Sequence, residues 1–277
     1  MGRIAIHSPL EIKQMRRVGQ LVSETLVMIA GHLRPGVTTD EIDTVVHEYT
    51  LAHGARPATL GYRGFTKSCC TSINEVVCHG IPGPAVLADG DIVNVDLTSV
   101  LPPKDGWHGD TSATFYIGEP TPEAIHVVEV ARQCLEIGIA QVRPGARLGD
   151  IGAAIQKFAE AQGCSVVREY TGHGIGRTFH AEPSVAHYGR AGTGPRLKRG
   201  MIFTIEPMIN YGRKEIEHVD DGWTVLTRDR SLSAQFEHTV VVARDGVEVL
   251  TARSAPLAHS EDKPWAKLGP LASYTAG

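Results

Sequence analysis

Two stretches near the middle of the chain carry the residue types that most directly suggest chemistry. Residues 91–98 and 108–115 alternate polar and apolar side chains with a period of two, which predicts the two strands of a β-hairpin. Asp96 lies on the polar face of the first strand and Asp110 on the polar face of the second. Two carboxylates brought together inside a sheet repel unless a cation lies between them, so the hairpin suggests a metal site. A solvated polar face is the alternative for either acid alone.

An internal repeat of the chain points to three further residues of metal-binding type, because His173, Glu206 and Glu237 correspond to His79, Asp96 and Asp110. The alternation around both glutamates again indicates strands, so we expect every acid of the set to be a strand residue. Four negative charges match two divalent cations, and a carboxylate-rich set with one imidazole suits Mn²⁺, Fe²⁺, Co²⁺ or Zn²⁺. Two such ions with a water between them are suited to hydrolysing an amide, and Glu206 or Glu237 could accept the proton of that water.

The composition excludes several classes of protein. Of the 277 residues, 42% are hydrophobic and the formal net charge is −4, as expected for one or two globular domains with an ample core. This charge argues against a direct nucleic-acid partner bound through a basic face. No run approaches the roughly 18 apolar residues of a spanning helix. An apolar signal-peptide core is also missing and the five cysteines include no Cys-x-x-Cys pair, so we expect a cytoplasmic protein without a membrane partner.

Capping signals predict four helices in two pairs. Residues 8–31 and 38–54 each begin with a Ser or Thr followed three residues later by Glu, and each ends at a glycine. A third helix begins at Thr121 and ends before residues 143–145, and a fourth ends at Gly163. Residues 55–118 are rich in strand patterns and contain the hairpin.

The two helix pairs belong to an internal repeat. Arg-Pro-Gly at 34–36 recurs at 143–145. Residues 90–96 are similar in sequence to residues 200–206, and residues 110–114 are loosely similar to residues 237–241. Chance and shared turn chemistry are the alternative explanation. We expect two halves, about 8–118 and 119–250, to form one domain over residues 1–255, with an α+β fold, a pseudo-twofold axis, an inner antiparallel sheet and outer helices. Residues 256–277 are expected to be a C-terminal tail.

The chain resembles the type I methionine aminopeptidases from about residue 8 to about residue 250. The motifs that carry the resemblance are Asn-Glu-Val-Val-Cys-His-Gly-Ile-Pro (74–82), Asn-Val-Asp (94–96), His-Gly-Asp-Thr (108–111), Thr-Gly-His-Gly-Ile-Gly (171–176), Phe-Thr-Ile-Glu-Pro-Met (203–208) and Glu-His-Thr (237–239). The resemblance implies the "pita-bread" fold and removal of the initiator methionine from new polypeptides. It also implies two divalent ions, which could be Co, Mn, Fe, Ni or Zn. Without a cysteine-rich extension ahead of the first helix, the chain is most similar to the short bacterial form.

The resemblance also assigns roles to residues. It implies that Asp96 chelates one ion, that Asp110 and Glu237 bridge both, and that His173 and Glu206 complete the second. Glu206 is then the general base as well. His79 and His180 would contact the scissile amide and stabilise the tetrahedral intermediate. The alternative is that His79 satisfies a turn and that His180 is a partly buried histidine without chemistry.

A pocket for the methionine side chain is implied by the same resemblance. Its walls would be the following residues: Thr59, Tyr62, Phe65, Cys70, Phe179 and Trp223. Aromatic edges and a polarizable sulfur pack well against a thioether, although each residue alone could equally fill the core. Thr59 stands where the family frequently has cysteine and Phe65 where it frequently has tyrosine, which leaves the preference of the pocket rim open.

Other readings remain at this point. An Xaa-Pro aminopeptidase or dipeptidase of the same fold usually has a large additional N-terminal domain, whereas about seven residues precede the first helix here. A non-catalytic pita-bread binding protein typically loses metal ligands, and all five are present. For the enzyme, the expected partner is the N-terminus of a peptide or nascent chain, with the ribosome as a further candidate, and the expected state is a monomer.

Overall fold

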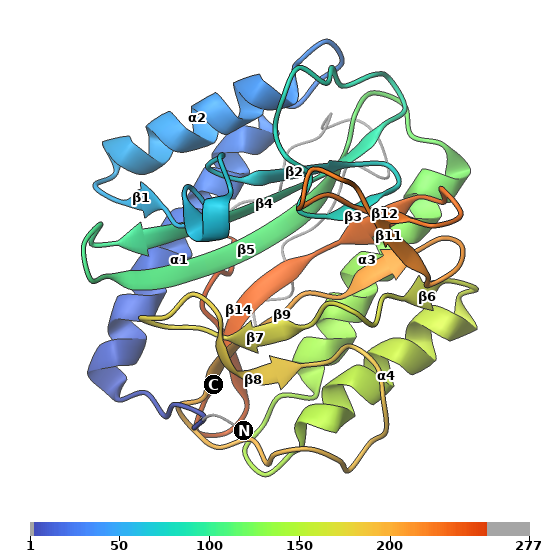
Figure 1. The fold of residues 1–277 in the computed structure, drawn as a ribbon. Helices are drawn as coiled ribbons and strands as arrows, with labels where there is room; N and C mark the ends of the chain where they lie inside the picture. Colours follow the sequence, from blue (N-terminus) through green and yellow to red (C-terminus); the bar gives the residue numbers. More distant parts are fainter. Residues whose placement is uncertain (1–2, 254–277) are drawn as a thin grey trace.

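Two pairs of helices, each followed by a group of strands, make up residues 3–253, the part of the chain that the computed structural model describes (Figure 1). The predicted tail, 256–277, lies outside the described residues. The helices are α1 (Pro9–Ala30), α2 (Thr39–Ala52), α3 (Pro122–Ala140) and α4 (Leu148–Ala161), with the short 3₁₀ helix η1 at Tyr62–Gly64. The strands are β1 (Arg56–Pro57), β2 (Cys70–Ile73), β3 (Val76–Cys78), β4 (Ile92–Leu101), β5 (Trp107–Tyr116), β6 (Ser165–Val166), β7 (Gly172–Gly174), β8 (Ala181–Val185), β9 (Ile202–Ile205), β10 (Met208–Asn210), β11 (Ile216–His218), β12 (Val225–Thr227), β13 (Ser233–Gln235), β14 (Glu237–Val242) and β15 (Val247–Val249).

The helices begin where the capping residues predict. The Ser8 side chain accepts the Glu11 N–H, and the Glu11 carboxylate accepts the Ser8 N–H, which closes a capping box at the start of α1. Thr38 and Glu41 make the same exchange at the start of α2. Among the described residues, no helix combines the length and apolar character that crossing a membrane requires.

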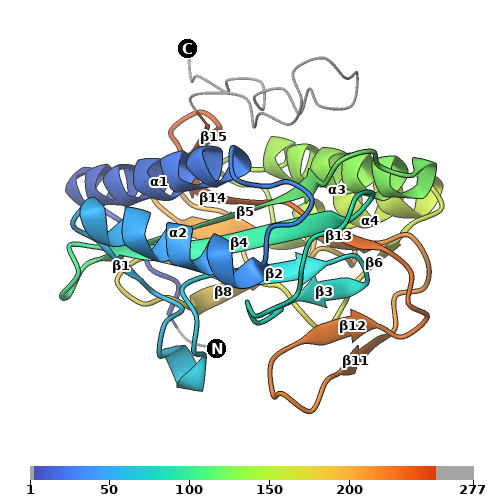
Figure 2. The ribbon, with the colours of Figure 1, turned by 90° about the horizontal axis from the view of Figure 1, so that it is seen from above.

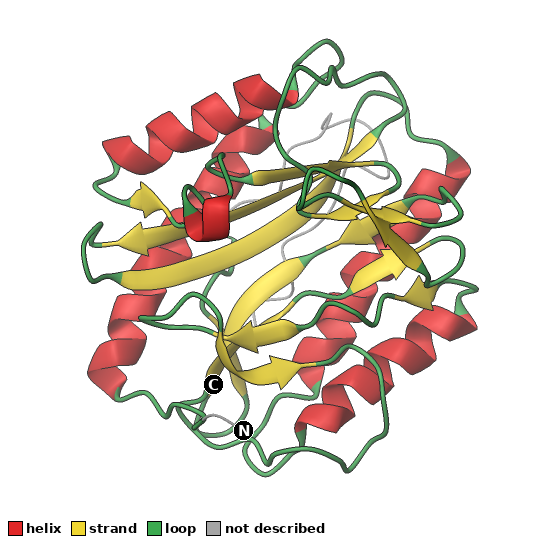
Figure 3. Ribbon diagram, viewed as in Figure 1, coloured by secondary structure: helices red, strands yellow, loops and turns green. Residues whose placement is uncertain are grey.

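The main sheet joins the two halves through one strand of each. Its order is β1-β4-β5-β14-β9-β7-β8, with β2 on β4 and β15 on β14, and every pairing is antiparallel. Strands β5 and β14 pair at the centre, where Glu237 lies opposite Ser112. Figure 3 shows the long β4 and β5 beside the shorter strands of the second half. The predicted α+β fold with an antiparallel sheet and outer helices is therefore confirmed.

The core lies between the sheet and the helices on one of its faces. Leu26 of α1, Val127 of α3, Phe115 of β5 and Phe203 of β9 are fully buried in one continuous apolar cluster. Burying a side chain of this size stabilises the fold by about 1.5–3 kcal/mol, so this layer holds the strands rigidly. Figure 2 shows α1 and α3 on one side of the sheet, with η1 and the β11–β12 pair on the other. That second side is the one on which a site can open.

The predicted hairpin is β4 and β5. Asp96 pairs with Ser112 and Thr98 with Asp110, so both aspartates lie on the same face of the sheet. The connecting residues 102–105 are exposed.

The prediction that every acid lies within a strand is wrong for Glu206. Strand β9 ends at Ile205 and β10 begins at Met208, so Glu206 lies in the break between them. Pro207 lacks the N–H that a continuous ladder needs, which accounts for the interruption. Glu237 is a strand residue, but it is the first residue of β14 and follows a similar break after β13.

Candidate active site

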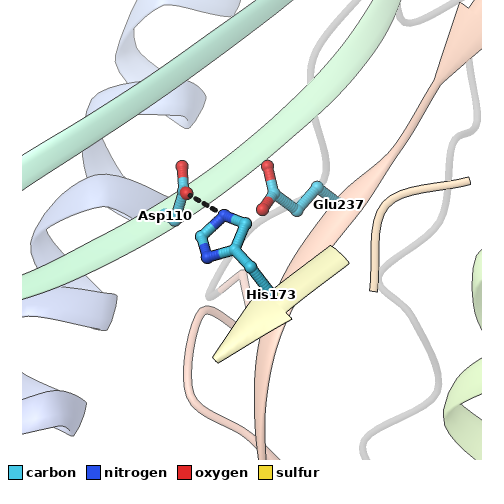
Figure 4. Close-up of side chains that lie close together, drawn as sticks. All are labelled: Asp110, His173 and Glu237. Carbon is cyan, nitrogen blue, oxygen red and sulfur yellow. Dashed lines mark ion pairs between the residues drawn. The ribbon is translucent and has the colours of Figure 1, made fainter. Parts of the chain in front are cut away.

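Three of the five predicted metal ligands form a tight cluster. One ligand atom from each of Asp110, His173 and Glu237 lies within 4.8 Å of the other two (Figure 4). They come from β5, β7 and β14, so the cluster straddles the centre of the sheet, where the two halves meet. Nε2 of His173 lies 3.5 Å from Oδ2 of Asp110.

The other two predicted ligands face the same cluster. Nε2 of His173 lies 3.7 Å from Oε1 of Glu206. Asp96 is close enough to Asp110 and Glu206 for their charges to act on it, after burial, in raising the pKa of its carboxyl group well above the usual range. The structure therefore brings together all five side chains, two from the first half and three from the second.

Burial makes this cluster unfavourable for negative charge. It raises the pKa of Glu237 well above its usual range, with the neighbouring Asp110, Glu206 and Asp96 adding to the effect, and it raises the pKa of Glu206 to about 7. Each uncompensated buried charge costs several kcal/mol, and together they would approach the whole stability of a typical domain, about 5–15 kcal/mol. Oε1 of Glu237 is buried without a hydrogen-bond partner among the described residues. A carboxylate cluster with an unsatisfied oxygen fits divalent cations.

The histidine of the cluster is oriented to act as a ligand. Burial lowers the pKa of His173, but its contact with Asp110 and the charges of Glu206 and Asp110 outweigh this and raise the pKa to about 9. Nδ1 lies 3.1 Å from the carbonyl oxygen of Gly174. When Nδ1 carries the proton and donates it to that oxygen, the lone pair of Nε2 faces the carboxylates, as metal-binding histidines require.

Hydrogen bonds behind the ligands hold them in place. Oγ1 of Thr98 donates to Oδ1 of Asp110 at 2.7 Å, and Oγ1 of Thr204 donates to Oε1 of Glu206 at 2.6 Å. The backbone N–H of Glu206 donates to Nε2 of His187 at 3.0 Å.

Sequence reasoning missed these three supporting residues. Thr98 lies directly across the hairpin from Asp110, and Thr204 lies two positions before Glu206. The period-two pattern could therefore have identified both threonines. His187 carries no such signal, because its approach to Glu206 depends on the path of a loop.

A cavity of about 250 Å³ opens above the cluster. Its lining includes Asp96, Asp110 and His173 of the cluster, both predicted non-ligand histidines and all six predicted pocket residues. Arg63 and Thr98 also line it, although the sequence did not single them out. The complete lining is Thr59, Tyr62, Arg63, Phe65, Cys70, His79, Asp96, Thr98, Asp110, His173, Phe179, His180 and Trp223.

The walls of the cavity are largely aromatic. Phe65 meets Trp223 edge-on with ring centroids 5.0 Å apart, and Tyr62 lies 4.9 Å from Phe179. Burial, followed by the charge of Asp96, raises the pKa of the Cys70 thiol well above its usual range, so this sulfur is a neutral packing surface. Thr59 is buried at the same cavity and its hydroxyl has no partner among the described residues.

The two non-ligand histidines both line this cavity. The ring of His180 lies 4.1 Å from that of His173, and burial together with the charge of His173 lowers the pKa of His180 to about 4. His79 has a φ of 57°, a left-handed conformation that is uncommon outside glycine, and its ring meets Tyr170 edge-on at 5.2 Å. Burial lowers the pKa of His79 as well. Neutral imidazoles in these places can donate hydrogen bonds to a substrate amide.

Comparison with known proteins agrees with this geometry. Residues 13–244 match the model of metallopeptidase family M24. The chain is similar to methionine aminopeptidase A of Synechocystis sp. (strain ATCC 27184 / PCC 6803 / Kazusa), with 55% identity over 249 residues, 90% of this chain and 97% of the relative. It is 54% identical over 252 residues to methionine aminopeptidase of Escherichia coli (strain K12), covering 90% and 94% of the two chains.

A solved structure has the same fold. The crystal structure of methionine aminopeptidase from Rickettsia prowazekii superposes with a TM-score of 0.88 at 52% sequence identity. The superposition covers 90% of this chain and 100% of that one. The likeness therefore extends over nearly all of the described residues, including both halves of the site.

Proposed function

This chain belongs to metallopeptidase family M24 and, within it, to the methionine aminopeptidases, and we propose that its five-residue cluster holds two divalent ions that support hydrolysis of the peptide bond after an N-terminal methionine. The observation that carries the proposal is the convergence of four carboxylates and one imidazole from both halves, three of which (Asp96, Asp110 and His173) line an aromatic cavity. Four carboxylates would balance the charge of two such ions, for which Mn, Fe, Co, Ni and Zn are the candidates. Asp110 and Glu237, on adjacent central strands, would contact both.

Divalent ions in this site would polarise the scissile carbonyl and lower the pKa of a water molecule. The Glu206 carboxylate would accept the proton of that water and pass it to the leaving amine. His79 and His180, which both line the cavity, would donate hydrogen bonds to the scissile amide and to the oxygen on which charge develops. The aromatic wall, with Phe65 and Trp223, would hold the methionine side chain and exclude water from it.

The physiological substrate is proposed to be a new polypeptide that begins with methionine and has a small second residue, because two ions held by the cluster would crowd the site of the second residue. We place the reaction in the cytoplasm, on chains leaving the ribosome, with the enzyme acting as a monomer. All five cysteines are free and buried, as suits a reducing compartment, and every proposed site residue comes from this one chain. Residues 1–255 are proposed to act as one catalytic domain of two halves.

A peptide panel tests the proposal. Chelator-treated protein is assayed on Met-Ala-Ser, Met-Leu-Ser and Ala-Pro-Ser, with and without added Mn²⁺ or Co²⁺. We expect release of methionine from Met-Ala-Ser in the presence of metal and much slower release from Met-Leu-Ser. Faster cleavage of Ala-Pro-Ser would favour an Xaa-Pro peptidase, and no cleavage of any peptide with metal present would favour a binding protein.

A further inference from the structure

Arg63 lies at the rim of the cavity in an unusual backbone conformation. It belongs to η1, which stands out from the helix-free side of the sheet in Figure 2, and its φ is 48°. Non-glycine residues rarely adopt this left-handed region. Glycines with positive φ lie on either side of it, Gly61 at 82° and Gly64 at 90°. The turn therefore presents an exposed arginine at a position where glycine would be easier to accommodate.

The side chain of Arg63 differs from those of its charged neighbours in having no polar partner within the described residues. Arg56 donates to the carbonyl oxygen of Pro103 at 2.8 Å, and Lys67 pairs with Asp40 at 2.5 Å. The guanidinium of Arg63 lies 5.4 Å from the centre of the Tyr62 ring, a cation–π contact. Within residues 3–253 it has no hydrogen bond or ion pair. All of its donors thus remain available to a ligand at the mouth of the cavity.

A series of ring contacts leads from the metal cluster out to Arg63. The His180 ring lies 4.1 Å from that of His173, the Tyr62 ring stacks on His180 at 5.2 Å, and Arg63 covers Tyr62. A substrate with its methionine against Phe65 and its scissile amide beside His180 sends the rest of its chain outward. Because an extended chain advances about 3.3 Å per residue, the residues shortly after the cleaved bond come alongside Arg63.

We propose that Arg63 is a specificity-determining residue that favours substrates with Asp or Glu at the third or fourth position from the N-terminus. This inference rests on the proposed function and names a substrate class for it. A guanidinium with free donors pairs well with a carboxylate, and a Lys side chain at the same substrate position is repelled. Arg63 lies near the solvent, so the preference is modest and weakens with salt.

Two peptide series, Met-Ala-X-Ser and Met-Ala-Ser-X with X as Glu, Gln or Lys, test the inference. The ratio of kcat/KM for Glu over Lys is expected to be about two- to fivefold in the natural enzyme at low salt in at least one series. In Arg63→Ala this ratio should fall to about one, and in Arg63→Glu it should invert. Arg63→Lys should retain part of the preference. Because each ratio is taken within one protein preparation, partial misfolding does not change it.

Arg17→Ala supplies the matched control, since Arg17 is an exposed arginine of α1 and does not line the cavity. Its ratio should equal that of the natural enzyme. If the Gln peptides are cleaved but the Glu over Lys ratio is the same in the natural enzyme and Arg63→Ala, the inference about Arg63 is wrong and the proposed function stands. If no peptide is cleaved by any form with metal present, both are wrong.

Discussion

The two halves of the molecule deliver their acids to the site in different ways. In the first half, Asp96 and Asp110 lie inside two ten-residue strands whose pairing is continuous. In the second half, Glu206 lies in a break after β9 and Glu237 begins β14. The aspartates are fixed by the strand ladder itself, whereas Glu206 lies where the ladder is interrupted and Glu237 lies where a strand begins.

The interruption changes what each glutamate needs for support. Glu206 has no strand partner, and its backbone N–H and its carboxylate are instead held by His187 and Thr204. The first half thus supplies two acids fixed by a continuous strand ladder, and the second half supplies Glu206, the acid proposed to move a proton.

The largest expected effect comes from the two acids at the centre of the sheet. Replacing Asp110 or Glu237 with Ala should remove both ions, because each acid is proposed to contact both. Activity should fall by far more than the roughly 10- to 100-fold typical of residues behind a ligand. Metal per chain, measured by plasma mass spectrometry, is compared with kcat/KM. The exposed acid Glu48 on α2 gives the control, since Glu48→Ala should keep both metal and activity. Two tightly held ions in either central variant would contradict the bridging role.

A smaller difference should separate Glu206→Gln from Asp96→Asn. Each substitution removes one charged ligand from one half, so metal content should fall similarly. Glu206→Gln also removes the proposed proton acceptor, and its residual kcat should be lower than that of Asp96→Asn after both are saturated with Mn²⁺. Circular dichroism checks that each variant is folded. Equal residual kcat values would show that Glu206 acts only as a ligand.

The contrast between the continuous strands of the first half and the interruption at Glu206 in the second explains how much could be predicted from the sequence. The hairpin was correct because alternation persists along both strands, and the helices were correct because Ser8 and Thr38 carry capping boxes. The strand prediction was wrong at Glu206. The neighbouring Pro207 indicates a break there, because proline has no N–H to donate to a strand ladder. The roles proposed for the site residues remain predictions. Arg63 and His187 could not be predicted, because their positions depend on the paths of loops and leave no periodic pattern.

His79 offers the next test, because it directly follows β3 and none of the proposed metal ligands belongs to that strand. His79→Ala should lower kcat by about 100-fold, the typical loss of one donor to a developing charge, while metal content stays unchanged. His53→Ala, which alters an exposed histidine at the end of α2, is the control. A parallel loss of bound metal would instead identify His79 as a ligand.

The smallest effect is expected from His187, which accepts a hydrogen bond from the backbone N–H of Glu206. His187→Ala removes the acceptor of the Glu206 N–H and should weaken Mn²⁺ binding by about tenfold, as measured by titration calorimetry. His187→Gln, whose side-chain oxygen can accept the same bond, should restore much of the affinity. If both variants bind Mn²⁺ equally weakly, His187 acts through packing alone.

The central claim is that five side chains from the two halves enclose a pair of ions, and a crystal grown with Mn²⁺ tests it most directly. Anomalous scattering should give two peaks about 3.5–4 Å apart. Both peaks should contact Asp110 and Glu237, one should also contact Asp96, and the other should contact His173 and Glu206. Peaks elsewhere on the protein, or none at this cluster at saturating Mn²⁺, would contradict the account.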